Sequence, residues 1–147
     1  MKRIKLTIAY DGTNYCGWQI QPNGITIEEV INKALQKLTG EPILVIGASR
    51  TDSGVHAMGN VAVFDTETTI PTEKIAVALN QRLPEDIVIV KSEDVAADFH
   101  PRYCDCSKTY EYHIINTRIP IPTKRLTNYF VSYVLDIEKM RKAASYL

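Results

Sequence analysis

One stretch organises this sequence: Ile43-Leu44-Val45-Ile46-Gly47-Ala48-Ser49-Arg50-Thr51-Asp52-Ser53-Gly54-Val55-His56-Ala57. The apolar, β-branched residues at its start and again at 60–64 predict two strands, 43–47 and 60–64, joined by a loop. Glycines in that loop allow sharp turns and close approach to a ligand. Because functional side chains often lie on loops held by rigid strands, Arg50 and Asp52 are candidate site residues. A plain hairpin loop in which Asp52 caps a turn and pairs with Arg50 explains the spacing equally well.

The segments around this loop predict an α+β fold. Alternating apolar residues make 3–10 a half-buried strand, and Thr26 with Glu29 forms a capping box that opens a helix with apolar positions at helical spacing. A second helix begins at 71–72 and ends before residue 84, and 87–90 form the next strand. The order β-α-β-β-α-β predicts a ferredoxin-like unit, with an antiparallel sheet, two helices on one face and the other face free to bind.

The remainder of the chain reads as the beginning of a second half. Strands are predicted at 108–115 and 129–134, and a helix at 137–147 that stops without a capping glycine. We therefore divide the sequence into a ferredoxin-like catalytic-loop domain, 1–100, and the start of an incomplete α+β half, 101–147. This pattern also leads us to expect a truncated chain, whose open sheet edge would favour self-association.

Composition and charge narrow the possible classes of protein. The 147 residues are 45% hydrophobic and 23% charged, which suits one globular domain or one and a fraction. Neither a signal peptide nor a membrane-spanning run is recognisable, so we expect a cytoplasmic protein with no membrane partner. Residues 1–100 carry 9 basic and 13 acidic side chains, whereas 101–147 carry 8 and 4. Arg102 and Lys108 lie in this basic part among tyrosines, a combination that suits RNA but also an ordinary surface.

The residue types also permit two other chemistries. A metal site would use His100, Cys104, Cys106 and His113, but the usual Cys-x2-Cys pairs are missing, so no metal is predicted and the cysteines are expected to be reduced. Asp11, at the end of a strand and followed by Gly-Thr, is similar to the nucleophile of aspartyl phosphatases. Those enzymes have a second aspartate two residues before the one that precedes the glycine, where this chain has Ala9, so a magnesium-dependent phosphotransferase is the weaker alternative.

The loop also resembles a known signature. Arg50-Thr51-Asp52-x-Gly54-Val55-His56-Ala57 resembles that of the tRNA pseudouridine synthase A family. Four further segments, spread over almost the whole chain, resemble other motifs of the family: 10–19 (Tyr-Asp-Gly-Thr-x-Tyr-x-Gly-Trp-Gln), 79–87, 98–102 and 107–112. Asn60 stands where the family usually has glutamine.

The resemblance implies an isomerase that converts uridine to pseudouridine at positions 38–40 of the tRNA anticodon stem-loop, without cofactor or metal. Asp52 would be the catalytic carboxylate, acting either as nucleophile on C1′ or as base at C2′. Arg50 would hold the flipped-out nucleotide and Tyr110 would stack on the uracil. Trp18, Arg102 and Lys108 are expected as weaker RNA contacts.

Further expectations concern the assembly and the rival function. Family members are homodimers, and we expect the present chain to be inactive alone. His56 is predicted to be a structural hydrogen-bonding residue. The alternative is a non-catalytic RNA-binding module, which would carry exposed aromatic side chains on its central strands.

Overall fold

The computed structural model describes residues 1–147. The chain forms two compact units, 1–106 and 107–147, which are described separately. None of the helices combines the length and the apolar composition needed to cross a membrane.

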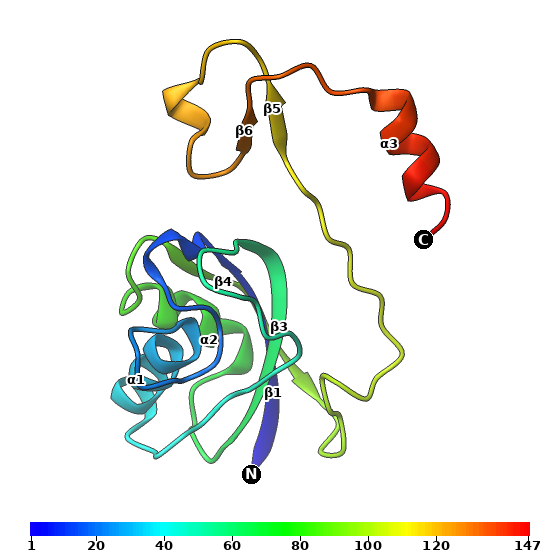
Figure 1. The fold of residues 1–147 in the computed structure, drawn as a ribbon. Helices are drawn as coiled ribbons and strands as arrows, with labels where there is room; N and C mark the ends of the chain where they lie inside the picture. The colour runs from blue at the N-terminus through cyan, green and yellow to red at the C-terminus, as the bar shows by residue number, and fades with distance from the viewer. The chain divides into compact units, whose positions relative to one another are not determined.

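The first unit is built on a four-stranded sheet in the order β2-β3-β1-β4. Its strands are β1 (Lys2–Tyr10), β2 (Ile46–Gly47), β3 (Ala57–Thr66) and β4 (Ile87–Val95), and every neighbouring pair is antiparallel. The helices are α1 (Ile27–Thr39), α2 (Thr72–Asn80) and the short 3-10 helix η1 (Gly12–Asn14). Helices α1 and α2 lie on one side of the sheet (Figure 1). This arrangement confirms the predicted α+β, ferredoxin-like order.

Local sequence patterns explain the main elements of this unit. Alternate side chains of β1 point toward the helices and are buried in the core, whereas the residues between them are only half-buried. At the start of α1, the Thr26 hydroxyl accepts a hydrogen bond from the amide of Glu29, as the capping box predicts. Helix α1 then ends at Gly40, whose φ of 75° is readily adopted only by glycine. Helix α2 turns Ile75, Ala76 and Leu79 into the core.

The strand predicted at 43–47 is reduced to the two residues of β2. Ile43 and Val45 are buried, as their apolar character suggests. However, the amide of Val45 donates to Oδ1 of Asn32 on α1, at 2.9 Å, instead of to a neighbouring strand. A backbone group satisfied by a side chain needs no strand partner, so the sheet begins only at Ile46.

The second face of the sheet is covered in part, whereas the sequence-based expectation left the whole face free. The segment after β4 lies across it: the Phe99 carbonyl accepts from Nη1 of Arg3 at 3.0 Å, and the Phe99 ring lies 5.8 Å from Nζ of Lys5. Farther along, Nε of Arg102 donates to the carbonyl of Gly47 in β2 at 2.8 Å. Val63, which pairs with Lys5 on this face, is fully buried.

The second unit contains the parallel strand pair β5 (Ile114–Asn116) and β6 (Tyr129–Val131), the 3-10 helix η2 (Pro122–Lys124) and helix α3 (Ile137–Ala144). Both strands and the helix are shorter than predicted. Val131 is the single buried hydrophobic side chain of this unit. The Asn116 amide holds the chain after β6 by donating to the carbonyls of Val131 and Tyr133. Residues 107–113 form no strand because no neighbouring strand pairs with them.

Candidate active site

The Arg50–Asp52 loop forms one wall of a hollow of about 340 Å³ in the first unit. This volume lies at the lower end of the range for small-molecule pockets. The opposite wall comes from the segment between η1 and α1. The lining residues are Cys16, Gln19, Ile20, Gln21, Arg50, Thr51, Asp52 and Ser53.

Side chains alternate along the loop. Thr51 points into the protein, where its Oγ1 lies 2.6 Å from the hydroxyl of Tyr10. Arg50 and Asp52, on either side of it, are exposed and line the same hollow. No ion pair joins the guanidinium of Arg50 to the carboxylate of Asp52, so the pairing offered by the plain hairpin explanation is not formed. An arginine and a carboxylate are therefore both available to a ligand.

The backbone of the loop is fastened to the segment 15–18. The Trp18 amide donates to the Thr51 carbonyl at 3.0 Å, and the Gly54 amide donates to the Tyr15 carbonyl at 3.3 Å. Gly17 has a φ of 80°, and a Cβ there would lie 2.5 Å from the Thr51 oxygen, so this close approach requires glycine. The first two amides of α1 in turn donate to the carbonyls of residues 17 and 18. Backbone hydrogen bonds thus connect the loop to segment 15–18, and that segment to the start of α1.

Trp18 does not occupy the place predicted for an RNA contact. Its side chain is 1% exposed and lies in the core, with its ring centroid 6.1 Å from that of Tyr10 and its edge against Gly47. A buried ring presents no face on which a base could stack. In this structure Trp18 supports the end of β2, directly before the loop.

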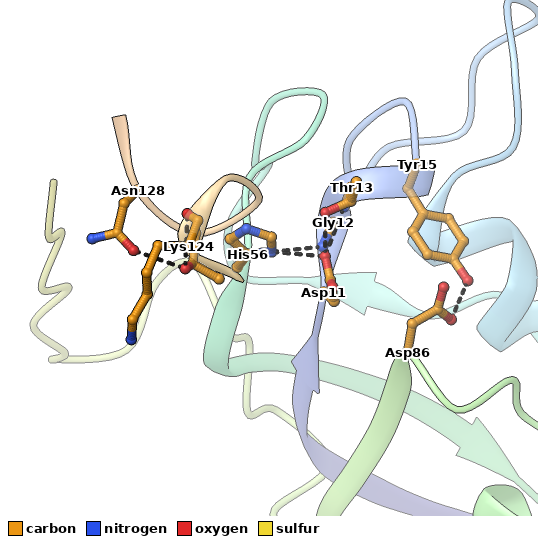
Figure 2. Close-up of polar contacts among 9 residues, drawn as sticks. Asp11, Gly12, Thr13, Tyr15, His56, Asp86, Lys124 and Asn128 are labelled. Carbon is orange, nitrogen blue, oxygen red and sulfur yellow. Dashed lines mark hydrogen bonds and ion pairs between the residues drawn. The ribbon is translucent and has the colours of Figure 1, made fainter. Parts of the chain in front are cut away.

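Asp11 and His56 form a structural contact beside the loop (Figure 2). The Asp11 carboxylate caps η1 by accepting from the hydroxyl and the amide of Thr13, and these bonds lower the pKa of Asp11. Nδ1 of His56 lies 3.1 Å from the amide of Gly12 and 3.0 Å from Oδ1 of Asp11. A neutral Nδ1 accepts from Gly12, whereas a protonated Nδ1 donates to Asp11. These contacts agree with a structural His56 and argue against Asp11 as a phosphotransferase nucleophile.

Tyr15 anchors the neighbouring turn. Its hydroxyl donates to Oδ1 of Asp86 at 2.6 Å (Figure 2), and burial, followed by the Asp86 carboxylate, raises the pKa of Tyr15. The Asp86 carbonyl accepts from the amide of Asp11 at 2.9 Å. This contact therefore joins the start of β4 to the segment that carries the wall of the hollow.

The other predicted site residues are distributed over both units. Nε of Arg102 donates to the carbonyl of Gly47, which directly precedes the loop in the sequence. Lys108 and Tyr110 belong to the second unit, where Tyr110 is 71% exposed. The structure therefore brings Arg50 and Asp52 together in one hollow, whereas the predicted lysine and tyrosine come from a separate part of the chain.

Asn60 is a supporting residue that the sequence analysis did not identify. It is 8% exposed, and its Nδ2 lies 3.3 Å from the hydroxyl of Tyr10 and 3.1 Å from the carbonyl of Ser49. The sequence does contain a signal for this role: Asn60 is a polar residue at an inward-facing position of β3, where the next inward-facing residues are Ala62 and Phe64. Such a residue needs hydrogen-bond partners inside the protein.

The same structure bears on the metal alternative. None of the three cysteines forms a disulfide, and no group of three or more histidine, cysteine, aspartate or glutamate side chains is arranged to hold a metal ion.

Comparison with known proteins assigns the family. A sequence profile described as tRNA pseudouridine synthase matches residues 6–104. A protein of Thermoanaerobacter sp. (strain X514) named tRNA pseudouridine synthase A is 52% identical over 147 residues, covering 100% of this chain and 60% of the relative. Proteins of the same name from Acetivibrio thermocellus and Myxococcus xanthus are 51% identical over 146 residues and 44% identical over 147. They are matched over 60% and 56% of their own lengths, and over 99% and 100% of this chain. Although it spans only about 60% of the length of most of these curated relatives, the chain belongs to the tRNA pseudouridine synthase family.

Proposed function

We propose that this chain supplies the catalytic carboxylate of an enzyme that isomerises uridine to pseudouridine at positions 38–40 of the tRNA anticodon stem-loop. The observation that carries the proposal is that Arg50 and Asp52 lie together on one wall of a hollow. Both side chains are exposed, and no ion pair joins them. Their loop is the one whose sequence resembles the family signature.

The reaction needs a carboxylate but no net oxidation. The bond between N1 of uracil and C1′ of ribose breaks, the base turns, and C5 bonds to C1′ while the C5 proton leaves and N1 gains a proton. An ionised Asp52 acts either by attacking C1′ and later leaving as the carboxylate, or by removing and returning the C2′ proton. Both routes place the carboxylate against the ribose of a nucleotide that has left the base stack.

Four other side chains have proposed roles in binding. Arg50 holds the phosphate or the place of the flipped nucleotide, and the exposed ring of Tyr110 stacks on the uracil while its hydroxyl assists removal of the C5 proton. Arg102 keeps its terminal guanidinium nitrogens for a phosphate, because only Nε is used by Gly47. Lys108, which is exposed, adds a further phosphate contact.

Residues 1–147 by themselves are proposed to bind tRNA weakly and not to isomerise it. Asp52 is exposed on the wall of an open hollow, and the chain corresponds to 60% of its Thermoanaerobacter relative. A carboxylate that is not held against ribose from several sides loses orders of magnitude in rate. The proposal for the whole enzyme keeps the homodimer and, since its substrate is tRNA, the cytoplasmic location.

The rival function, a non-catalytic RNA-binding module, finds less support. It requires exposed aromatic side chains on the central strands β1 and β3. Tyr10 and Phe64 are the aromatic residues of these strands, and they are 5% and 2% exposed. The sheet therefore offers no stacking platform of the kind that such modules use.

The test is release of tritium from tRNA labelled at C5 of uridine, with protein in excess. It uses the 147-residue chain and a chimera that continues it with the C-terminal part of the Thermoanaerobacter relative. We expect release by the chimera alone, loss of release with Asp52→Asn, and unchanged release with Glu85→Gln, which alters an exposed carboxylate outside the hollow. Filter binding of tRNA shows whether the variants still bind. Undiminished release by Asp52→Asn would contradict the catalytic assignment.

A further inference from the structure

We infer that Tyr10 is a positioning residue of the active site, whose buried hydroxyl sets the direction of Arg50 and Asp52 by holding Thr51 between them. The inference rests on the proposed catalytic role of Asp52 and adds the hydrogen bond that orients its carboxylate. It assigns to Tyr10 a function beyond filling the core at the end of β1.

Three side chains form a hydrogen-bonded chain beneath the loop. Nδ2 of Asn60 donates to the Tyr10 hydroxyl at 3.3 Å, and that hydroxyl is 2.6 Å from Oγ1 of Thr51. The Tyr10 hydroxyl and Oγ1 of Thr51 share one hydrogen bond in which either oxygen can be the donor. Burial raises the pKa of Tyr10, so the hydroxyl keeps its proton over the working pH range.

This chain of hydrogen bonds restrains the part of the loop that matters for chemistry. Asn60 also donates to the Ser49 carbonyl at 3.1 Å, and the Thr51 carbonyl accepts from Trp18 at 3.0 Å. Thr51 is therefore held through both its side chain and its backbone. In an extended segment, successive side chains point to opposite sides, so an inward Thr51 turns Arg50 and Asp52 outward together.

The link between β1 and the loop is direct, with no intervening residue. Tyr10 is 5% exposed and belongs to the central strand of the sheet, which is a rigid support. Sites carried on rigid elements keep reacting groups in place, and a displacement of about 1 Å can cost about a hundredfold in rate.

The first test uses the 147-residue chain and does not depend on activity. Hydrogen exchange is measured for the amide of Val55, which donates to the Asp52 carbonyl at 3.1 Å. Tyr10→Phe and Thr51→Val are each expected to accelerate this exchange by about tenfold or more, whereas Thr51→Ser keeps the wild-type rate. Thr66→Val is the matched control for Thr51→Val, because it removes a buried hydroxyl whose 2.8 Å bond goes to Glu41 instead of the loop.

The second test measures single-turnover tritium release by the chimera. Tyr10→Phe is expected to lower the rate constant by about tenfold to a hundredfold while the apparent KM for tRNA changes by less than about twofold. The double variant Tyr10→Phe/Thr51→Val should be no slower than the slower single variant, because both remove the same hydrogen bond. Thr66→Val, whose hydroxyl bonds Glu41, should lower stability without lowering the rate constant.

The outcomes separate the inference from the proposed function. If Asp52→Asn abolishes release but Tyr10→Phe and Thr51→Val leave both the rate and the Val55 exchange unchanged, the positioning role is wrong and the function stands. If Asp52→Asn still reacts, the proposed function fails, and the exchange result alone decides whether Tyr10 holds the loop. Should Tyr10→Phe not fold, the comparison of Thr51→Val with Thr51→Ser decides, and equal behaviour of these two overturns the inference.

Discussion

Gly17→Ala tests the packing that places the active-site loop. Three glycines have nearly the same positive φ: Gly17 at 80°, Gly40 at 75° and Gly54 at 78°. An added Cβ meets nothing within 4 Å at Gly40 or Gly54, but at Gly17 it would lie 2.5 Å from the Thr51 carbonyl oxygen. Alanine at any of the three therefore costs about 1–2 kcal/mol for the left-handed backbone. At Gly17 the forced displacement adds about 1–3 kcal/mol.

We therefore expect Gly17→Ala to lower the free energy of unfolding by about 2–5 kcal/mol, against about 1–2 kcal/mol for each control. Urea unfolding followed by tryptophan fluorescence measures the difference, since Trp18 is the single tryptophan and is 1% exposed. Equal losses for Gly17→Ala, Gly40→Ala and Gly54→Ala would refute the close contact between segment 15–18 and the loop.

Three further predictions concern the second unit, acid stability and RNA binding. Tyr110→Phe in the chimera should keep tRNA affinity but slow tritium release, because the ring is retained and the hydroxyl is lost; release at the wild-type rate would remove the hydroxyl from the mechanism. Hydrogen bonds from Lys5 and then Lys91 lower the pKa of Glu93 from 4.5 to about 2. The resulting stabilisation is full above the ordinary pKa and is lost as the pH falls from about 4.5 toward 2, so Glu93→Gln should reduce the fall in urea midpoint between neutral and acid pH. A Gln variant with the wild-type pH profile would contradict this. Lys108→Gln should reduce the salt dependence of tRNA binding by about one unit of slope in a plot of log K against log salt concentration, and an unchanged slope would exclude a phosphate contact.

The predicted order of strands and helices agrees with the structure because it depends on patterns within short segments. Alternation of apolar residues in β1, the capping box at Thr26 and the glycine after α1 each act over a few neighbouring residues. Strand lengths were predicted less well. The Val45 amide is taken by Asn32, and the strand predicted from residue 108 has no neighbour before residue 114. Both effects depend on residues outside the segment in question.

The candidate site shows the same division. The presence of Arg50 and Asp52 on one loop follows from the sequence, and the chemistry expected of them is what the resemblance to the family implies. The burial of a side chain does not follow from its residue type. Trp18 is an aromatic residue of the kind that stacks on RNA bases, yet it is buried and packs under the end of β2. Asn60 reads as one polar residue in an apolar strand, and only its contacts with Tyr10 and Ser49 give it a role.

By itself the sequence determined the fold class, the position of the loop and the family. The fold class follows from the local periodicity of apolar residues, and the loop and the family follow from one dense motif. The tertiary structure alone decided which way the loop faces. Thr51 turns inward because its hydroxyl meets that of Tyr10, a partner 41 residues away in the chain. Part of the second sheet face is covered because the Phe99 carbonyl accepts from Arg3, which lies 96 residues away in the chain. Contacts between such distant residues form only when the whole unit packs, so no pattern within a short segment can encode them.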